Sequence, residues 1–154
     1  MQNIEKQFQE SVDIIHDFEL QMPSRRPKVL LQTAAHVSGG AFYYRRVDQF
    51  KLHLLGVCIH PKYGGWFGIR AVIIFRNVHT PNLVECLPED VLPTKDERIK
   101  LLCLFNDDWQ SGKYRDIIPV QERYSQLQID YFKHKPRDRI QFVKENIFKN
   151  FLNS

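Results

Sequence analysis

Apolar residues recur at intervals of three and four through the first part of the chain. Within residues 3–18 they are Ile4, Phe8, Val12, Ile15 and Phe18. This spacing gathers them on one side of a helix, so the pattern predicts an amphipathic helix over residues 3–18. The string MPSRRP at 22–27 follows. Its two prolines around two arginines predict a basic loop that ends the helix.

The next stretch, residues 29–44 (VLLQTAAHVSGGAFYY), contains no Asp, Glu, Lys or Arg. A helix without charged side chains on any face is buried on most of its surface, so we expect a buried helix here. Its small residues would let another backbone or a ligand approach closely. The pair Gly39-Gly40 either kinks this helix or ends it.

Two segments rich in β-forming residues lie further along, at 52–60 (LHLLGVCIH) and 66–75 (WFGIRAVIIF). The string PKYGG at 61–65 separates them and supplies glycines for a turn, so the pattern predicts a hairpin. Both faces of each strand are apolar. Strands of this kind are central in a sheet or covered on both sides.

The last half of the chain alternates irregular and helical patterns. Prolines at 81, 88 and 93 predict a surface crossing over 76–93. The string TKDE at 94–97 is a capping box, and the helix it opens should bury Ile99, Leu102, Cys103 and Phe105. Ser125 caps a predicted short helix that reaches Phe132. Pro136 begins a last amphipathic helix with Ile140, Val143, Ile147 and Phe151 on its apolar side.

Composition limits the class of protein. The chain has 154 residues with 43% hydrophobic and 26% charged residues, which fits one globular domain and excludes a disordered chain. Three cysteines without a CxxC pair disfavour a disulfide framework and a thiolate zinc site. The N-terminus is too polar for a signal peptide, and no apolar run is long enough to span a membrane. We therefore expect a soluble cytoplasmic protein.

Arg70 is the one charge within the strand pattern of residues 66–75. A buried guanidinium needs a partner, because an unpaired buried charge costs several kcal/mol. Two interpretations are open. Arg70 forms a structural ion pair with an acidic residue, or it holds an anionic ligand through a two-pronged contact.

Other candidate residues carry a functional and a structural interpretation side by side. Gln32, Thr33 and His36 share one helix face, which fits either core hydrogen bonds or a pocket. Cys58 and His60 share one strand face, but an apolar run should raise the pKa of the thiol and leave it inert. The sequence contains no HExxH, P-loop or GxGxxG motif, and no metal site is expected.

The net charge of +4 permits an anionic partner. Basic residues alternate with aromatic ones between 113 and 139, which fits a single-stranded nucleic-acid surface or a solvated face with local ion pairs. The sequence lacks a known RNA or DNA motif, so a nucleic-acid module is the weakest interpretation.

Four strings together resemble the cobalamin-processing proteins of the methylmalonic aciduria and homocystinuria type C family. They are RRPKVLLQTAAHVSGGAFYYRR, GVCIHPKYGGWFGIRAVIIF, VLPTKDERIKLL and WQSGKYRDIIPVQERYSQLQIDYF, in the same order as in the family. The resemblance covers residues 25–139. It implies an α+β fold like that of the flavin nitroreductases, with part of its N-terminal half missing and the central antiparallel hairpin packed by helices.

The resemblance also implies an enzyme, a cyanocobalamin reductase and alkylcobalamin dealkylase. Such an enzyme eliminates cyanide with reduced flavin (FMN, with FAD as a second option) and NADPH as the ultimate reductant. It transfers alkyl groups from cobalamin to glutathione. By correspondence of position, the glutathione-binding residues are Arg70, Arg115 and Arg139. The residues matched to the cobalamin and flavin site are Val29, Leu30, Leu31, Gln32, His36, Tyr43, Tyr44, Arg45, Cys58 and Ile69.

The chain also departs from the pattern of the family. We expect residues 1–24 to form an N-terminal helix and loop, and residues 25–154 to form the C-terminal part of a nitroreductase-like domain. Arg45 stands where relatives carry glutamine, which bears on flavin affinity. The implied partners are cobalamin, glutathione, a downstream cobalamin-trafficking adaptor, methionine synthase and, through the PSRRP loop, a ligand-dependent second copy. A catalytically impaired cobalamin-binding chaperone is the alternative function.

Overall fold

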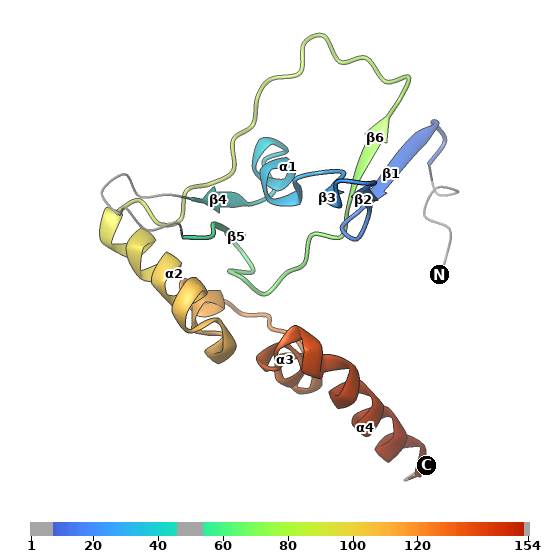
Figure 1. Cartoon of the computed structure of the whole chain (residues 1–154). Helices are drawn as coiled ribbons and strands as arrows, with labels where there is room; N and C mark the ends of the chain where they lie inside the picture. Colours follow the sequence, from blue (N-terminus) through green and yellow to red (C-terminus); the bar gives the residue numbers. More distant parts are fainter. Residues whose placement is uncertain (1–7, 46–53, 153–154) are drawn as a thin grey trace.

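The computed structural model describes residues 8–45 and 54–152, and it combines short strands with helices (Figure 1). The strands are β1 (Val12–His16), β2 (Leu20–Gln21), β3 (Arg26–Pro27), β4 (Phe42–Tyr44), β5 (Val57–Ile59) and β6 (Ala71–Phe75). The α-helices are α1 (Leu31–Val37), α2 (Lys95–Asp107), α3 (Gln126–Lys133) and α4 (Arg139–Leu152). Three 3₁₀ turns, η2 (Trp109–Ser111), η3 (Lys113–Asp116) and η4 (Pro136–Asp138), connect the helices. The α+β class predicted from the sequence is confirmed.

The predicted N-terminal helix is wrong over its described part. Residues 12–16 form strand β1, which pairs antiparallel with β6 from Val12 opposite Phe75 to His16 opposite Ala71. The three-residue spacing of Val12 and Ile15 suited a helix, but the apolar run of β6 offers backbone partners that a local helix would forgo. The predicted residues 3–7 lie outside the described part of the chain.

The predicted helix over 29–44 is shorter in the structure. Helix α1 ends at Val37, and the chain turns at Gly39, whose φ of 77° lies in the left-handed region. Strand β4 then begins at Phe42. Of the two outcomes left open for the glycine pair, the structure takes the one in which the glycines end the helix.

The predicted hairpin between 52–60 and 66–75 is also wrong. Strand β5 pairs with β4, with Phe42 opposite Ile59 and Tyr44 opposite Val57, while β6 pairs with β1. The glycine turn forms only the isolated bridge between His60 and Gly64 before the chain diverges. Strand β5 is buried as expected, but the side chains of residues 73–75 in β6 are exposed, so β6 is not covered on both sides.

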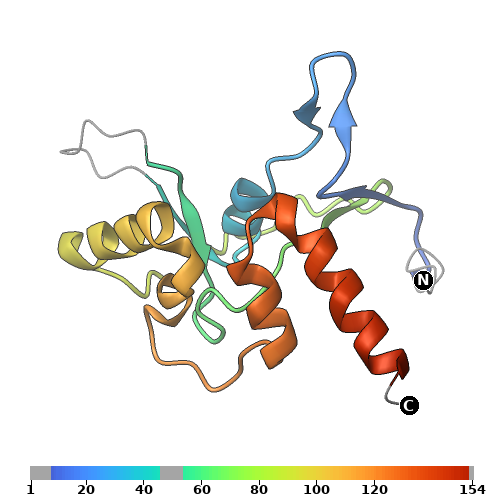
Figure 2. The same cartoon turned by 60° about the horizontal axis from the view of Figure 1, so that its bottom comes forward.

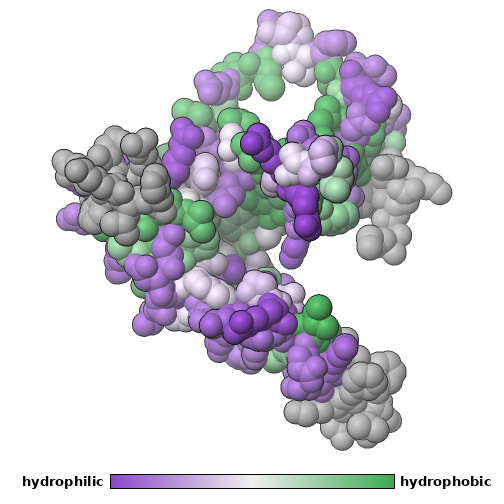
Figure 3. All heavy atoms as spheres, in the orientation of Figure 1, coloured by the Kyte–Doolittle hydropathy of each residue, from purple (hydrophilic) through white to green (hydrophobic). Residues whose placement is uncertain are grey.

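Residues 76–93 cross the surface as predicted and form an arch between β6 and α2 (Figures 1 and 3). Figure 3 shows an opening between this arch and the rest of the chain. Leu83 is 79% exposed and Val84 83% exposed, so the middle of the arch lies outside the core, whereas Leu92 near its end is buried.

The core forms where α2 packs against β4, β5 and η3. The capping box predicted at the start of α2 is confirmed, because the Thr94 hydroxyl accepts a hydrogen bond from the Glu97 amide and the Glu97 carboxylate binds back to Thr94. The buried cluster consists of Tyr44, Val57, Ile59, Leu92, Leu101, Leu102 and Tyr114. Of the four core positions predicted in this helix, Leu102 is fully buried, and Ile99, Cys103 and Phe105 are half-buried.

Helix α3 begins where the sequence predicts, whereas α4 begins at Arg139, after a 3₁₀ turn that starts at the predicted Pro136. The Ser125 hydroxyl accepts a hydrogen bond from the Gln128 amide at the start of α3, and Pro136 opens the turn that leads into α4. Figure 2 shows α4 projecting away from the strands. Ile140 and Val143 on its predicted apolar side are exposed. Nothing is described of the Ile147 and Phe151 side chains.

Candidate functional site

A cavity of about 440 Å³ lies at the start of α1, and we call it the α1 cavity. It takes residues from four separate segments, namely the turn after β1, residues 27–33 leading into α1, strand β4 and the chain before β6. Its lining residues are Asp17, Pro27, Val29, Leu30, Leu31, Gln32, Thr33, Tyr43 and Ile69. Six of these, Val29, Leu30, Leu31, Gln32, Tyr43 and Ile69, are among the ten predicted for the cobalamin and flavin site.

His36 and Gly56 hold Tyr43 in its place beside the α1 cavity. The Tyr43 amide donates a hydrogen bond to Nδ1 of His36 over 3.2 Å, which ties the end of α1 to β4. At Gly56, the residue before β5, an added Cβ would lie 2.6 Å from the Tyr43 ring. Only glycine therefore leaves room for the ring at this position. His36 supports the cavity through Tyr43 and is not itself a lining residue.

Gln32 carries an unusual polar atom. Its Oε1 is buried and accepts no hydrogen bond from any residue in the described part of the chain. A buried acceptor without a partner costs about 1–3 kcal/mol, so such an atom in a cavity wall is a candidate for hydrogen bonding to a ligand. The Gln32 carbonyl accepts a weak hydrogen bond from Cys58 Sγ at 3.4 Å.

Cys58 is buried behind this wall. Burial raises the pKa of its thiol from the ordinary 9.0 to about 11, so the thiol is protonated at neutral pH. The Nδ1 atom of His60 accepts hydrogen bonds from the amides of Lys62 and Tyr63. The burial of Cys58 makes it a structural cysteine, in agreement with the inert thiol expected from the sequence.

Tyr44 and Arg45, also predicted for this site, lie elsewhere. Tyr44 is only 2% exposed and belongs to the core. Its hydroxyl donates to Asp90 over 2.8 Å and accepts from the Leu92 amide over 3.0 Å. Burial and the Asp90 carboxylate raise the pKa of Tyr44 well above its ordinary value. Arg45 is exposed.

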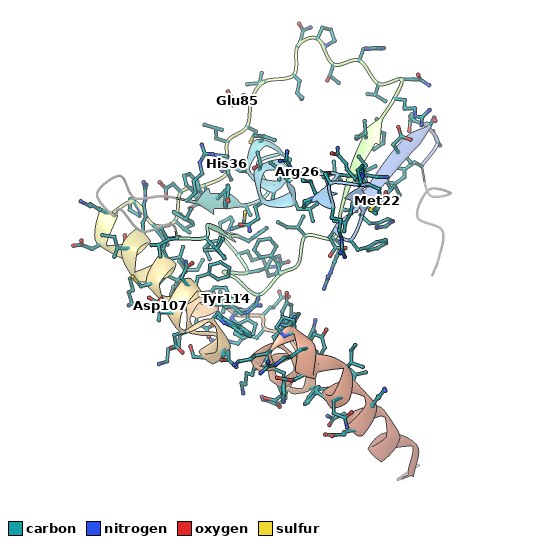
Figure 4. The ribbon with its side chains drawn as sticks, in the orientation of Figure 1. Met22, Arg26, His36, Glu85, Asp107 and Tyr114 are labelled. Carbon is teal, nitrogen blue, oxygen red and sulfur yellow. The ribbon has the colours of Figure 1, made fainter. Side chains whose placement is uncertain are left out.

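A second cavity of about 370 Å³ lies along α1 and shares Ile69 with the first. Small residues of α1 and the turn after it form one side: Ala34, Ala35, Ser38, Gly40 and Ala41. The close approach expected at these residues occurs at Gly39, where an added Cβ would lie 2.6 Å from the Cys86 carbonyl oxygen. A segment of the arch therefore packs on the end of α1. Figure 4 shows His36 on α1 and Glu85 on this arch.

A third cavity, of about 460 Å³, contains two of the three predicted glutathione-binding arginines, Arg115 and Arg139, and we call it the arginine cavity. It lies between the end of α2 and the α3 and α4 helices. Figure 4 shows Tyr114, one of its lining residues, beside α2. The full lining is Leu55, Trp66, Phe105, Asn106, Trp109, Gln110, Ser111, Gly112, Tyr114, Arg115, Ile129, Phe132, Lys133, Pro136 and Arg139.

Aromatic rings surround both guanidinium groups of the arginine cavity. The guanidinium carbon of Arg115 lies 5.0–5.5 Å from the ring centres of Trp66, Tyr114, Tyr124 and Phe132. That of Arg139 lies 5.2 Å from the Tyr131 ring and 5.4 Å from the Phe132 ring. Phe132 therefore contacts both cations, and stacking on aromatic faces holds a guanidinium while leaving N–H groups free.

The remaining contacts of these arginines are with backbone oxygens. Arg115 donates to the Gly65 carbonyl, and Nε of Arg139 donates to the His134 carbonyl over 3.1 Å. Within the described part of the chain, neither arginine forms an ion pair with a carboxylate. Two half-buried cations without an acidic partner make an electropositive cavity suited to an anion.

The glycine turn at residues 61–65 packs against η3. The Gly65 amide donates to the Arg115 carbonyl over 3.0 Å, and a Cβ on Gly65 would lie 2.9 Å from the Arg115 Cα. Trp66 is fixed by its indole N–H, which donates to Asp116 over 2.8 Å. The turn therefore sets the position of Arg115 and of the ring beside it.

Arg70 does not join the other two arginines. Its side chain is 71% exposed and forms an ion pair of 3.0 Å with Asp17, so the prediction of a buried charge is wrong. Arg70 precedes β6, and the pair lies at the edge of the α1 cavity, which Asp17 and Ile69 line. Of the two interpretations left open, the structure contains the ion pair.

Sequence reasoning missed three aromatic lining residues of the arginine cavity, Trp66, Phe105 and Trp109. The alternation of basic and aromatic residues after 113 signalled its other half and was interpreted as a nucleic-acid surface or a solvated face. In the structure those rings stack on Arg115 and Arg139.

No helix of the described residues combines the length and the apolar character needed to cross a bilayer.

Comparison with known proteins agrees with the resemblance. The model of the methylmalonic aciduria and homocystinuria type C family matches residues 1–143. A Gallus gallus protein named cyanocobalamin reductase / alkylcobalamin dealkylase is 51% identical over 140 residues, covering 87% of this chain and 58% of that protein. Its Homo sapiens namesake is 46% identical over 134 residues, covering 84% of this chain and 47% of that protein.

The fold is matched as well. The crystal structure of a Caenorhabditis elegans B12-trafficking protein, CblC, superposes with a TM-score of 0.76 at 33% identity, covering 86% of this chain and 55% of that one. The chain thus spans about half the length of the relatives it matches. With a family model matched over residues 1–143, the chain belongs to the methylmalonic aciduria and homocystinuria type C family.

Proposed function

We propose that this chain processes cobalamin, by reductive elimination of cyanide from cyanocobalamin and by transfer of alkyl groups from alkylcobalamins to glutathione. The observation that carries the proposal is the α1 cavity. Six residues that the family resemblance assigns to the cobalamin and flavin site come from three separate segments and line this one cavity. The relatives named cyanocobalamin reductase / alkylcobalamin dealkylase support the same activity.

The α1 cavity suits a ligand rich in amide and ring N–H groups. Apolar side chains of Val29, Leu30 and Ile69 line it, and the buried Oε1 of Gln32 offers an acceptor that no described residue uses. Cobalamin carries amide side chains and flavin carries a ring N–H, and either can donate to this oxygen. Reduced FMN, or FAD, would supply the electrons for removal of cyanide, with NADPH as their ultimate source.

The arginine cavity suits glutathione. The tripeptide ends in two carboxylates, and Arg115 and Arg139 offer two guanidinium groups that lack an acidic partner among the described residues. Nearby positive charge also favours the thiolate, which is the nucleophile. In dealkylation the sulfur–carbon bond forms as the carbon–cobalt bond breaks, and the bonding electron pair leaves with cobalt. The products are an S-alkylglutathione and the reduced cobalamin.

A second function has a specific observation in its favour. Arg70 is engaged by Asp17 rather than directed into the arginine cavity. This ion pair suits a cobalamin-binding chaperone without turnover. In either case we propose a cytoplasmic protein that passes cobalamin to a trafficking adaptor and methionine synthase, and that forms a ligand-dependent dimer through the PSRRP loop.

Visible spectroscopy of the purified chain tests these proposals. Methylcobalamin is added first without and then with glutathione, and the spectrum is followed under anaerobic conditions. A shift to the form with the lower base detached, followed by glutathione-dependent loss of the methyl group, supports the enzyme. A shift without turnover supports the chaperone, and no shift contradicts both. Cyanocobalamin with reduced FMN tests the decyanation in the same way.

A further inference from the structure

The arginine cavity has an apolar wall as well as a cationic one. Leu55, Phe105 and Trp109 form it on the side of α2 and η2. On the side of α3 and α4, Ile129 and Pro136 add further apolar surface next to the two arginines. Glutathione itself is a polar tripeptide, so it leaves this apolar surface without a matching group.

Leu55 is the exposed part of this wall. Its side chain is 70% exposed, which is unusual for leucine at a cavity. The backbone beneath it is fixed, because the Asn106 side chain accepts from the Leu55 amide over 2.9 Å and donates to the Leu55 carbonyl over 3.0 Å. Asn106 also donates to the Leu102 carbonyl over 2.8 Å, which anchors the clamp to α2.

The opposite side of the cavity is held in a similar way. The side-chain amide of Gln110 donates to the Lys133 carbonyl over 2.8 Å and links η2 to the end of α3. Lys133, the third cation of this cavity, forms an ion pair of 2.9 Å with Asp130. Among the described residues, Arg115 and Arg139 have no such acidic partner. The apolar wall and the two cations are therefore carried by elements tied to one another.

The geometry points to a second ligand class for this cavity: thioethers of glutathione that carry an aliphatic S-substituent. The inference rests on the proposed binding of glutathione. When the two terminal carboxylates of the tripeptide are held by the two guanidinium groups, the central cysteine sulfur projects from between them. An alkyl chain on that sulfur then lies on Leu55, Phe105 and Trp109, where water is released from both apolar surfaces.

This arrangement has a consequence for the proposed reaction. Its product is an S-alkylglutathione, which keeps both carboxylates of the substrate and gains an apolar group. The cavity therefore binds product more tightly than substrate, and the advantage grows with the alkyl chain. Each fully buried methylene contributes about fourfold in affinity. Release of long-chain products from the arginine cavity would then limit turnover.

A ligand series with the full chain tests the inference. Glutathione and its S-methyl, S-butyl and S-hexyl derivatives are titrated in turn by calorimetry. We expect affinity to increase along the series, with S-hexylglutathione bound at least about tenfold more tightly than S-methylglutathione. If glutathione binds but affinity stays constant or decreases from the S-methyl to the S-hexyl derivative, the inference is overturned and the proposed function still stands. Failure of all four compounds to bind overturns both the inference and the glutathione site on which it rests.

Two matched variants locate the apolar wall. Leu55→Ser removes an exposed side chain that lines the cavity, and Leu83→Ser removes one that is 79% exposed on the arch. Both side chains are exposed, so neither change should unfold the chain. We expect Leu55→Ser to reduce the hexyl-to-methyl preference about threefold or more, and Leu83→Ser to leave that preference unchanged. An unchanged preference in Leu55→Ser overturns the placement of the alkyl chain.

Discussion

The guanidinium of Arg70 lies 3.0 Å from the carboxylate of Asp17, and the Asp17 amide donates to the Arg70 carbonyl over 2.9 Å. The two residues are therefore joined through both side chain and backbone. These two contacts hold the turn after β1 against the chain before β6. They also place the Arg70 side chain at the rim of the α1 cavity. Its guanidinium is 71% exposed, and exposed ion pairs contribute about 0–1 kcal/mol, so the pair can be broken at little cost.

Asp17→Asn should release Arg70. If Arg70 takes part in glutathione binding, the variant binds glutathione about two- to fivefold more tightly, because the side chain no longer has to leave its partner first. In that case Arg70→Gln should weaken binding. The matched control is Asp13→Asn, which breaks the ion pair with Arg76 at the far end of the same strand pair. Unchanged affinity in both Asp17→Asn and Arg70→Gln would mean that the pair is purely structural.

Arg115→Gln should weaken glutathione binding by about tenfold or more, since hydrogen bonds to charged groups contribute about 1.5–3 kcal/mol. The measurement is the concentration of glutathione that gives half the maximal rate of methylcobalamin dealkylation. Lys113→Gln is the control, because Lys113 is a neighbouring cation that pairs with Asp108 outside the cavity. Equal effects of the two changes would point to general surface charge rather than to the arginine cavity.

Gly64→Ala should destabilise the chain by about 2 kcal/mol. Gly64 has a φ of 56°, and an added Cβ would collide with the Arg115 carbonyl oxygen and lie 2.9 Å from Val120 Cγ1. Gly40→Ala provides the comparison, because its added Cβ meets nothing closer than 3.5 Å. Thermal unfolding followed by circular dichroism should show a lower Tm for Gly64→Ala alone. A Tm equal to that of the unmodified chain would contradict the turn geometry.

Gln32→Leu should separate binding from stability. The change removes a buried oxygen that has no partner among the described residues, so the free energy of unfolding should stay equal or increase. If Oε1 binds a ligand, affinity for FMN or for cobalamin should fall about fivefold or more. Fluorescence quenching of FMN and the cobalamin spectrum measure the two affinities. Full retention of both would exclude Oε1 as a ligand contact.

Cys58 should make the stability of the chain depend on pH, and its thiol should react slowly. Its pKa is raised from 9.0 to about 11 by burial, so the folded state retains a proton that the unfolded state releases first. The stability contributed by this group is complete below pH 9 and is lost as the pH increases toward 11. Urea unfolding at a series of alkaline pH values measures the loss, with Cys58→Ala as the variant that should lack this part of it.

The same burial predicts which thiols react. At neutral pH iodoacetamide should modify the exposed Cys86 before the buried Cys58, as followed by mass spectrometry of the peptides. In denaturant the two rates should converge. Equal rates in the folded chain would show that Cys58 is more accessible than the structure indicates.

Short-range features of this chain could be read from its sequence because their partners lie within one turn. The Thr94 and Glu97 capping box and the Ser125 cap each satisfy backbone amides three residues away. Pro136 opens a helical turn because its ring fixes φ near the helical value. The same holds for the turn at Gly39, which needs a left-handed backbone that glycine adopts without strain. The inertness of Cys58 also followed from its apolar neighbours.

The sequence by itself thus determined the C-terminal helices, the arch and the family to which the chain belongs. Tertiary structure decided the pairing of β1 with β6, in which the partners His16 and Ala71 are 55 residues apart in sequence. It also decided the packing of Arg115 among the rings of Trp66, Tyr114, Tyr124 and Phe132. It also decided that Arg70 meets Asp17 at the surface. The physical reason is that a residue pattern records which surfaces must be covered, whereas the covering partner is selected by packing and hydrogen bonding across the whole chain.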